Sequence, residues 1–194
     1  GVFFGYIDTI MLGHFVTGEF IGYYAVAFSL VASAAAIIGF SSAAVFPIFL
    51  RLKGKQLETG FRKTRLITIL ISLMAAIVTF FLAKYVILIA YGKEYLAAVP
   101  ILQILSLFVL IGPIIGLYDH YLTSQEKTKA IAFLLIITTI INIGLNWAFI
   151  TYGLRFGMFE ALIGAATATI ISRGLYLLGI IWFKKRSQKV ISSD

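Results

Sequence analysis

Two charged residues interrupt long apolar runs of this chain, and both are candidates for chemistry. Asp8 lies in GVFFGYIDTIMLGHF, and Arg173 lies in TATIISRGLYLLG. An ionisable side chain inside a run long enough to cross a bilayer is costly, so it faces a cavity, a substrate path or a partner. Asp8 is therefore a candidate cavity carboxylate, able to take up a proton, or one member of a helix–helix hydrogen bond or of an ion pair with Lys84.

Further along the chain, amide side chains form a polar stripe. Asn142 and Asn146 are four residues apart, with Thr138 and Thr139 one turn earlier, so helical spacing places them on one face. Such amides can hydrogen-bond sugar hydroxyls, and they can equally join neighbouring helices within a membrane. Both interpretations remain open from the sequence.

The run at 98–123 carries two further features. Asp119 stands beside His120, an acid–imidazole pair that is a candidate ion relay, although adjacent residues on a helix point about 100° apart. Pro113, with Gly112 and Gly116 beside it, predicts a kink inside this helix.

Catalytic signatures are missing from the sequence. It has no cysteine, no GxxxxGK[ST] phosphate loop and no HExxH pattern. We therefore expect no catalytic residue, no metal, no cofactor and no nucleotide hydrolysis by this chain.

The elements that must position these residues follow from composition. The chain is 61% hydrophobic and 12% charged, whereas soluble domains are about one quarter charged. The apolar runs are continuous and reach the roughly 20 residues that a spanning helix needs, unlike the short alternating segments of a membrane barrel. We predict an all-α, six-helix transmembrane bundle in a single domain, with a partial first span at 1–14 and full spans near 20–50, 65–91, 98–123, 129–151 and 160–183.

The basic residues of the loops alternate from one crossing to the next. RLKGKQLETGFRKTR holds six Lys/Arg, SQEKTK two and KKRSQK four, while the intervening loops hold only Lys93 and Arg155. The positive-inside rule therefore places 51–65, 124–129 and the tail 184–194 in the cytoplasm, and the other loops outside. The net charge of +8 is thus a topology signal and a contact for anionic lipid, and we expect no nucleic-acid partner.

Four segments in this order carry a family resemblance. They are DTIMLGHFVTGEFIGYYAVAFSL, VFPIF, AYGKEYLAAVPILQIL and NIGLNWAFITYGLRFGMFEALIGAATATIIS. Together they resemble the second half of polysaccharide-type flippases, the O-antigen flippase-like branch of the multidrug/oligosaccharidyl-lipid/polysaccharide exporter superfamily. The resemblance implies a transporter of two six-helix lobes facing a central cavity. This chain would be the C-terminal lobe, cut within its first helix, with the N-terminal lobe of the same chain as its missing partner.

The resemblance also implies a function, namely flipping a lipid-linked oligosaccharide or polysaccharide precursor across the cytoplasmic membrane by alternating access. Arg173 would then receive the diphosphate, Asp8 would balance that cation in the empty site, and Asn142 and Asn146 would meet sugar hydroxyls. The alternative is that Arg173 and Asp8 form a pair that only stabilises the fold. Two other functions remain open: a cation-coupled drug antiporter of the same superfamily, and a membrane scaffold subunit that transports nothing.

Overall fold

The computed structural model describes residues 2–191 and consists of helices. Side chains are described for residues 7–40 and 43–186. No strand occurs within residues 2–191, so the predicted all-α fold is confirmed. The elements are α1 (Val2–Phe15), α2 (Gly18–Arg51), α3 (Gly54–Ala90), the 3-10 helix η1 (Lys93–Ala98), α4 (Val99–Ser124), α5 (Thr128–Gly153) and α6 (Met158–Ile191).

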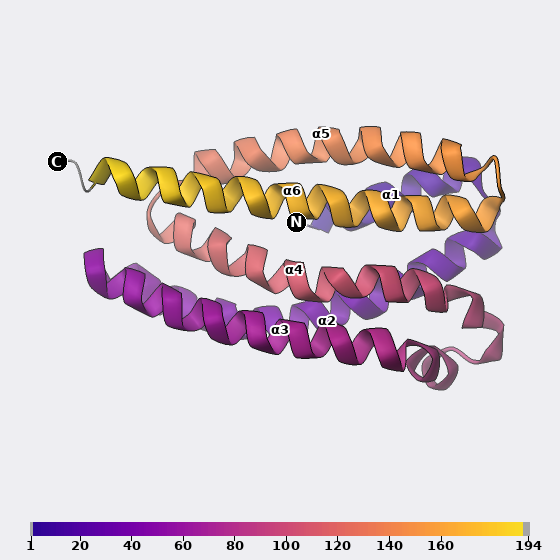
Figure 1. Cartoon of the computed structure of the whole chain (residues 1–194), viewed down its shortest axis with the longest axis horizontal. Coiled ribbons are helices and arrows are strands. Elements are labelled where there is room, and N and C mark those ends of the chain that lie inside the picture. Colours follow the sequence, from indigo (N-terminus) through magenta and orange to yellow (C-terminus); the bar gives the residue numbers. More distant parts are fainter. Residues whose placement is uncertain (1, 192–194) are drawn as a thin grey trace.

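The six α-helices run up and down along one long axis (Figure 1). The α2–α3 turn, the α4–α5 turn and the far end of α6 gather at one end of the bundle, and the remaining connections gather at the other. Helix α4 is central, since it packs extensively on α2, α3 and α6, while α5 packs mainly on α6. The short α1 fills the space beside α2, α5 and α6.

Many large apolar side chains face outward, as expected of helices in a lipid bilayer. Ile89 is 85% exposed on α3 and Phe81 is 72% exposed, and Ile140 on α5 is 64% exposed. In water, apolar exposure on this scale would favour aggregation. Within the described chain, five segments are long and apolar enough to cross a membrane. They are α2, α3, the combined η1–α4 segment, α5 and α6 up to Arg186.

Two segments predicted as a loop and a tail are helical instead. Helix α3 begins at Gly54, so most of the basic segment 51–65 forms its first turns, and α6 continues to Ile191. The reason lies in packing, because Leu57 and Phe61 occur one turn apart and are both buried against the end of α4. These basic turns therefore extend the bundle beyond the apolar spans.

A buried ion pair ties the two extensions together. Lys184 Nζ lies 2.8 Å from the Glu58 carboxylate, which also accepts a hydrogen bond from Tyr121 at 3.3 Å. The ammonium group lies 4.6 Å from the ring centroid of Phe61 and 4.7 Å from that of Tyr121, distances suited to cation–π attraction. The sequence analysis missed this pair because it joins residues 126 positions apart.

Candidate functional site

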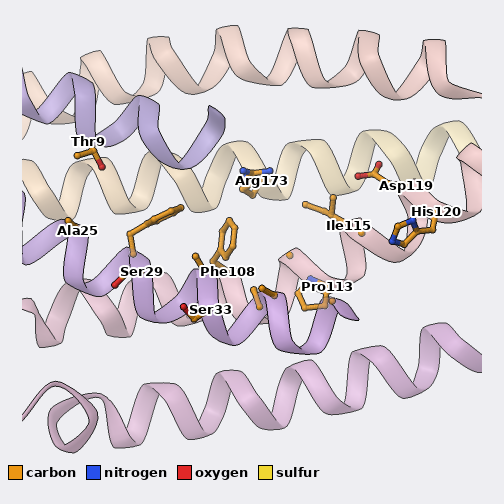
Figure 2. A pocket seen from close by; sticks show the side chains of 17 residues that line it. Thr9, Ala25, Ser29, Ser33, Phe108, Pro113, Ile115, Asp119, His120 and Arg173 are labelled. Carbon is orange, nitrogen blue, oxygen red and sulfur yellow. The ribbon is translucent and has the colours of Figure 1, made fainter. Parts of the chain in front are cut away.

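A cavity of about 880 Å³ opens between α1, α2, α4 and α6. The α2 wall is made of small residues such as Ala32 and Ser33, and the ionisable residues of the lining are Asp119, His120 and Arg173. Figure 2 shows these side chains reaching into one space from α4 and α6. The volume of the cavity is within the range of small-molecule sites, which combine an apolar wall with few polar groups.

Arg173 supplies a cation to the wall of this cavity. Its side chain leaves the middle of α6 and is 8% exposed. The guanidinium carbon lies 5.3 Å from the ring centroid of Phe108 on α4, and Asp8 and Asp119 both attract the charge. A guanidinium keeps its charge at any physiological pH and offers paired N–H donors, which match phosphate oxygens.

The candidate relay residues both contribute to the cavity. Asp119 accepts a hydrogen bond from the Tyr176 hydroxyl at 2.8 Å, and the His120 ring lies 5.2 Å from that of Phe46. Both side chains line the same space, although they are neighbours in sequence. An ion-relay role for them remains a prediction.

The α4 wall contains the predicted kink. Gly112, Pro113 and Gly116 all line the cavity, and Pro113 lies inside the continuous helix Val99–Ser124. Proline removes one backbone N–H from the helix ladder, so α4 lacks one backbone hydrogen bond beside the cavity. A change of helix direction here stays a prediction.

Asp8 lies apart from the cavity lining, in a buried polar network between helices. Its carboxylate is 0% exposed and accepts hydrogen bonds from Tyr24 on α2 at 2.8 Å, from Asn146 on α5 at 2.7 Å, and from Thr169 on α6. The residue after it, Thr9, is the one that lines the cavity. Three donors from three helices make Asp8 the hub that joins α1 to the bundle.

The stripe of amides on α5 belongs to the same network. Asn142 Nδ2 donates to Ser172 Oγ on α6 at 3.0 Å. The Oδ1 atoms of Asn142 and Asn146 are buried and have no hydrogen-bond partner among the described residues. The nearby Thr138 and Thr139 hydroxyls bond back to carbonyls of their own helix. The Asp8 carboxylate and the Asn146 amide thus meet in a buried place, and both groups have the chemistry to bind a proton or a hard cation.

Sequence reasoning missed two of the Asp8 donors and proposed a partner that the structure places elsewhere. Tyr24 and Thr169 lie 16 and 161 residues from Asp8, and only their hydroxyl groups within apolar runs could have singled them out. Lys84 is exposed on α3, and α3 makes no contact with α1 in the described chain. An Asp8–Lys84 ion pair is therefore not formed.

The family model described as polysaccharide biosynthesis protein matches residues 1–100. The chain belongs to this family of polysaccharide biosynthesis proteins. With its long apolar helices, it is a multi-pass membrane protein of the transport type. No curated protein matches the sequence, and no solved structure matches it either.

The match covers only part of the site of this polysaccharide biosynthesis protein. Residues 1–100 include Asp8, Tyr24 and the α2 wall of the cavity. Arg173, Asp119 and the α5 amides lie in the second half of the chain, outside the match.

Proposed function

We propose that this chain forms one lobe of a transporter that flips a lipid-linked oligosaccharide or polysaccharide precursor across the cell membrane. The observation that carries the proposal is Arg173, a buried guanidinium on the wall of an 880 Å³ cavity in a membrane protein of polysaccharide biosynthesis. The head group of such a precursor carries a diphosphate, the charged part and the one that is most costly to bring into apolar surroundings. A bidentate guanidinium offsets that cost.

Movement of the head group requires that the cavity open to each side of the membrane in turn. We propose that a second six-helix lobe faces the cavity and that the two lobes rock about the bound substrate, as in transporters built from repeated halves. Under the positive-inside rule, the basic first turns of α3 and the basic last turns of α6 support a cytoplasmic location for this end of the bundle.

The Asp8 network favours a second candidate, a cation-coupled drug antiporter of the same superfamily. Buried acids in transport proteins commonly carry coupling protons or ions. Asp8 accepts a hydrogen bond from Asn146, whose own amide oxygen has no hydrogen-bond partner among the described residues. The same network fits the flippase proposal, with the coupling ion at Asp8 and the substrate at Arg173. The two functions differ in whether transport requires the Arg173 guanidinium in the cavity.

The test is the export of lipid-linked saccharide in cells that depend on the protein. We expect Arg173→Lys to lower export about tenfold or more, because an ammonium group keeps the charge but loses the paired hydrogen bonds. Arg155→Lys is the matched control, since Arg155 is exposed at a loop, and it should export normally. Membrane abundance is measured in parallel by immunoblot.

The other outcomes are equally informative. Normal export by Arg173→Lys at normal abundance would remove Arg173 from the substrate site. Normal export by both Arg173→Lys and Arg173→Gln would favour a scaffold subunit that transports nothing. Loss of export that follows loss of abundance, with rescue by an Asp8→Arg/Arg173→Asp exchange, would assign the two residues to a structural pair.

A further inference from the structure

Three tyrosines gather beside the cavity at the end of the bundle opposite the basic helix extensions. The ring centroids of Tyr23 on α2 and Tyr95 on η1 are 6.0 Å apart, and those of Tyr95 and Tyr91 are 5.7 Å apart. We call Tyr23, Tyr91 and Tyr95 the tyrosine platform. Tyr91 is 40% exposed, so the platform is open to ligands.

The backbone of the α3–α4 connection builds the platform. Gly92 has φ 90°, a conformation that side chains other than glycine rarely adopt. This turn reverses the chain after α3 and brings Tyr95 back toward Tyr91. The Tyr95 ring also lies over Gly22 of α2, where an added Cβ would come within 3.9 Å of it.

The platform is continuous with the cavity. The Tyr91 hydroxyl lies 3.3 Å from Ser29 Oγ, and Ser29 is part of the cavity wall (Figure 2). A head group held at Arg173 could therefore extend along α2 toward the tyrosines. Two subsites joined by one wall suit a ligand with two chemically different parts.

The chemistry of the platform differs from that around Arg173. Glu19 accepts a hydrogen bond from the Tyr23 hydroxyl at 2.5 Å, and Glu94 lies near enough to interact electrostatically with Tyr23. Two carboxylates thus lie beside Tyr23, and their negative charge disfavours a phosphate at the platform. Aromatic faces with carboxylate and hydroxyl acceptors suit an uncharged ligand with many O–H donors.

We infer that the tyrosine platform is a saccharide subsite that binds uncharged pyranose rings. The C–H face of a pyranose stacks on a tyrosine ring, while its hydroxyls bond to Glu19, Glu94 and the phenol groups. Tyrosine is well suited to such contact, since it offers a rigid amphipathic surface at low entropic cost. The inference rests on the proposed function, because it assigns the sugar part of the same substrate to this place.

Membrane proteins also carry tyrosines at the lipid interface as anchors, and Tyr152 illustrates that use. It is 59% exposed at the same end of the bundle, with its ring 5.4 Å from that of Phe156 and 5.8 Å from the Arg155 guanidinium carbon. It is not among the residues that line the cavity or contact the platform. Tyr152 is thus the matched control.

The experiment measures direct binding of uncharged sugars to the protein in lipid nanodiscs. Saturation-transfer NMR is recorded with maltotriose, chitobiose and methyl rhamnoside, and with the linear polyol sorbitol as a ligand that lacks a ring face. We expect at least one pyranose probe to receive saturation at its ring C–H protons, and sorbitol to receive none. Tyr95→Ala should weaken that binding about tenfold, the effect of losing one aromatic contact.

The variants make the result decisive. Tyr152→Ala should bind the sugar like the wild type. Tyr95→Phe keeps the ring face and loses one phenol hydroxyl, so it should bind more tightly than Tyr95→Ala. Absence of binding by every pyranose probe, or equal weakening by Tyr152→Ala, would overturn the inference. Arg173→Gln should leave sugar binding intact, so failure of the diphosphate site and failure of the platform are separate results.

Discussion

At the scale of the residue, Asp8 shows how a membrane protein holds an acid without water. The carboxylate accepts from a phenol, an amide and a hydroxyl, each from a different helix. A buried donor that loses its acceptor destabilises the folded state by its full desolvation free energy. Asp8 therefore links α1 to the bundle whether or not it also binds an ion.

Replacing Asp8 should weaken the fold. We expect Asp8→Ala to lower the free energy of unfolding by about 1–3 kcal/mol, because Tyr24 and Thr169 would lose their acceptor and Asn146 would keep only the Asn142 carbonyl. Tyr24→Phe, which removes one donor, should cost about 1 kcal/mol. The measurement is denaturant unfolding of the purified protein, with Thr9→Ala as control on the neighbouring residue.

The same measurement separates an ion site from a purely structural hub. If Asp8 and the free Asn142 and Asn146 oxygens hold a cation, sodium should raise the melting temperature of the wild type relative to choline, and Asp8→Asn should abolish that shift. Equal melting temperatures in sodium and choline would exclude a sodium site at Asp8. The carboxylate would then bind a proton or serve only as a hydrogen-bond acceptor.

At the scale of the element, α5 and α6 approach each other through glycine. A Cβ added at Gly164 of α6 would lie 2.5 Å from the Phe149 carbonyl oxygen of α5. Small residues at such crossings allow the close contacts that hold helices together within a bilayer. This contact supports the helix that carries both Arg173 and Thr169.

Adding one methyl group there should separate the two helices. We expect Gly164→Ala to lower the free energy of unfolding by about 1–3 kcal/mol through overpacking. Gly174→Ala on the same helix is the matched control, since nothing lies within 4 Å of its added Cβ, and it should be neutral or slightly stabilising. Thermal unfolding measures the stability of both variants, and equal stability would contradict the tight α5–α6 contact.

At the scale of the whole molecule, the two ends of the bundle differ in charge and in surface chemistry. One end carries the basic turns of α3 and α6 joined by Lys184 and Glu58, and the other carries the tyrosine platform. If the basic end is cytoplasmic, a diphosphate-linked sugar held along α2 points its glycan outward. This orientation suits export.

Cysteine labelling tests the orientation. The sequence contains no cysteine, so Lys53→Cys and Arg155→Cys, both at exposed loop positions, report on opposite ends. In intact cells an impermeant thiol reagent should label Arg155→Cys and leave Lys53→Cys unlabelled until the membrane is opened. Labelling of both variants in intact cells would refute the arrangement.

The sequence by itself determined the class of the protein. Long apolar runs, sparse charge and alternating basic loops specify membrane helices because the bilayer admits few other structures. The same one-dimensional signals pointed to Asp8 and Arg173, since an ionisable residue in an apolar run is conspicuous on its own. They failed over most of 51–65, where charge indicated a loop but helix-period burial of Leu57 and Phe61 prevailed. They also failed beyond 184, where α6 continues to Ile191.

Only the tertiary structure decided which polar groups meet. Asp8 and Asn146 are 138 residues apart, and Asp8 and Thr169 are 161 apart, so no local pattern could pair them. Helix packing likewise separated Asp8 from the cavity wall, while Arg173, Asp119 and His120 came to line one space. The physical reason is that helix periodicity sets only the face on which a residue lies, whereas the crossing and depth of neighbouring helices set what that face contacts.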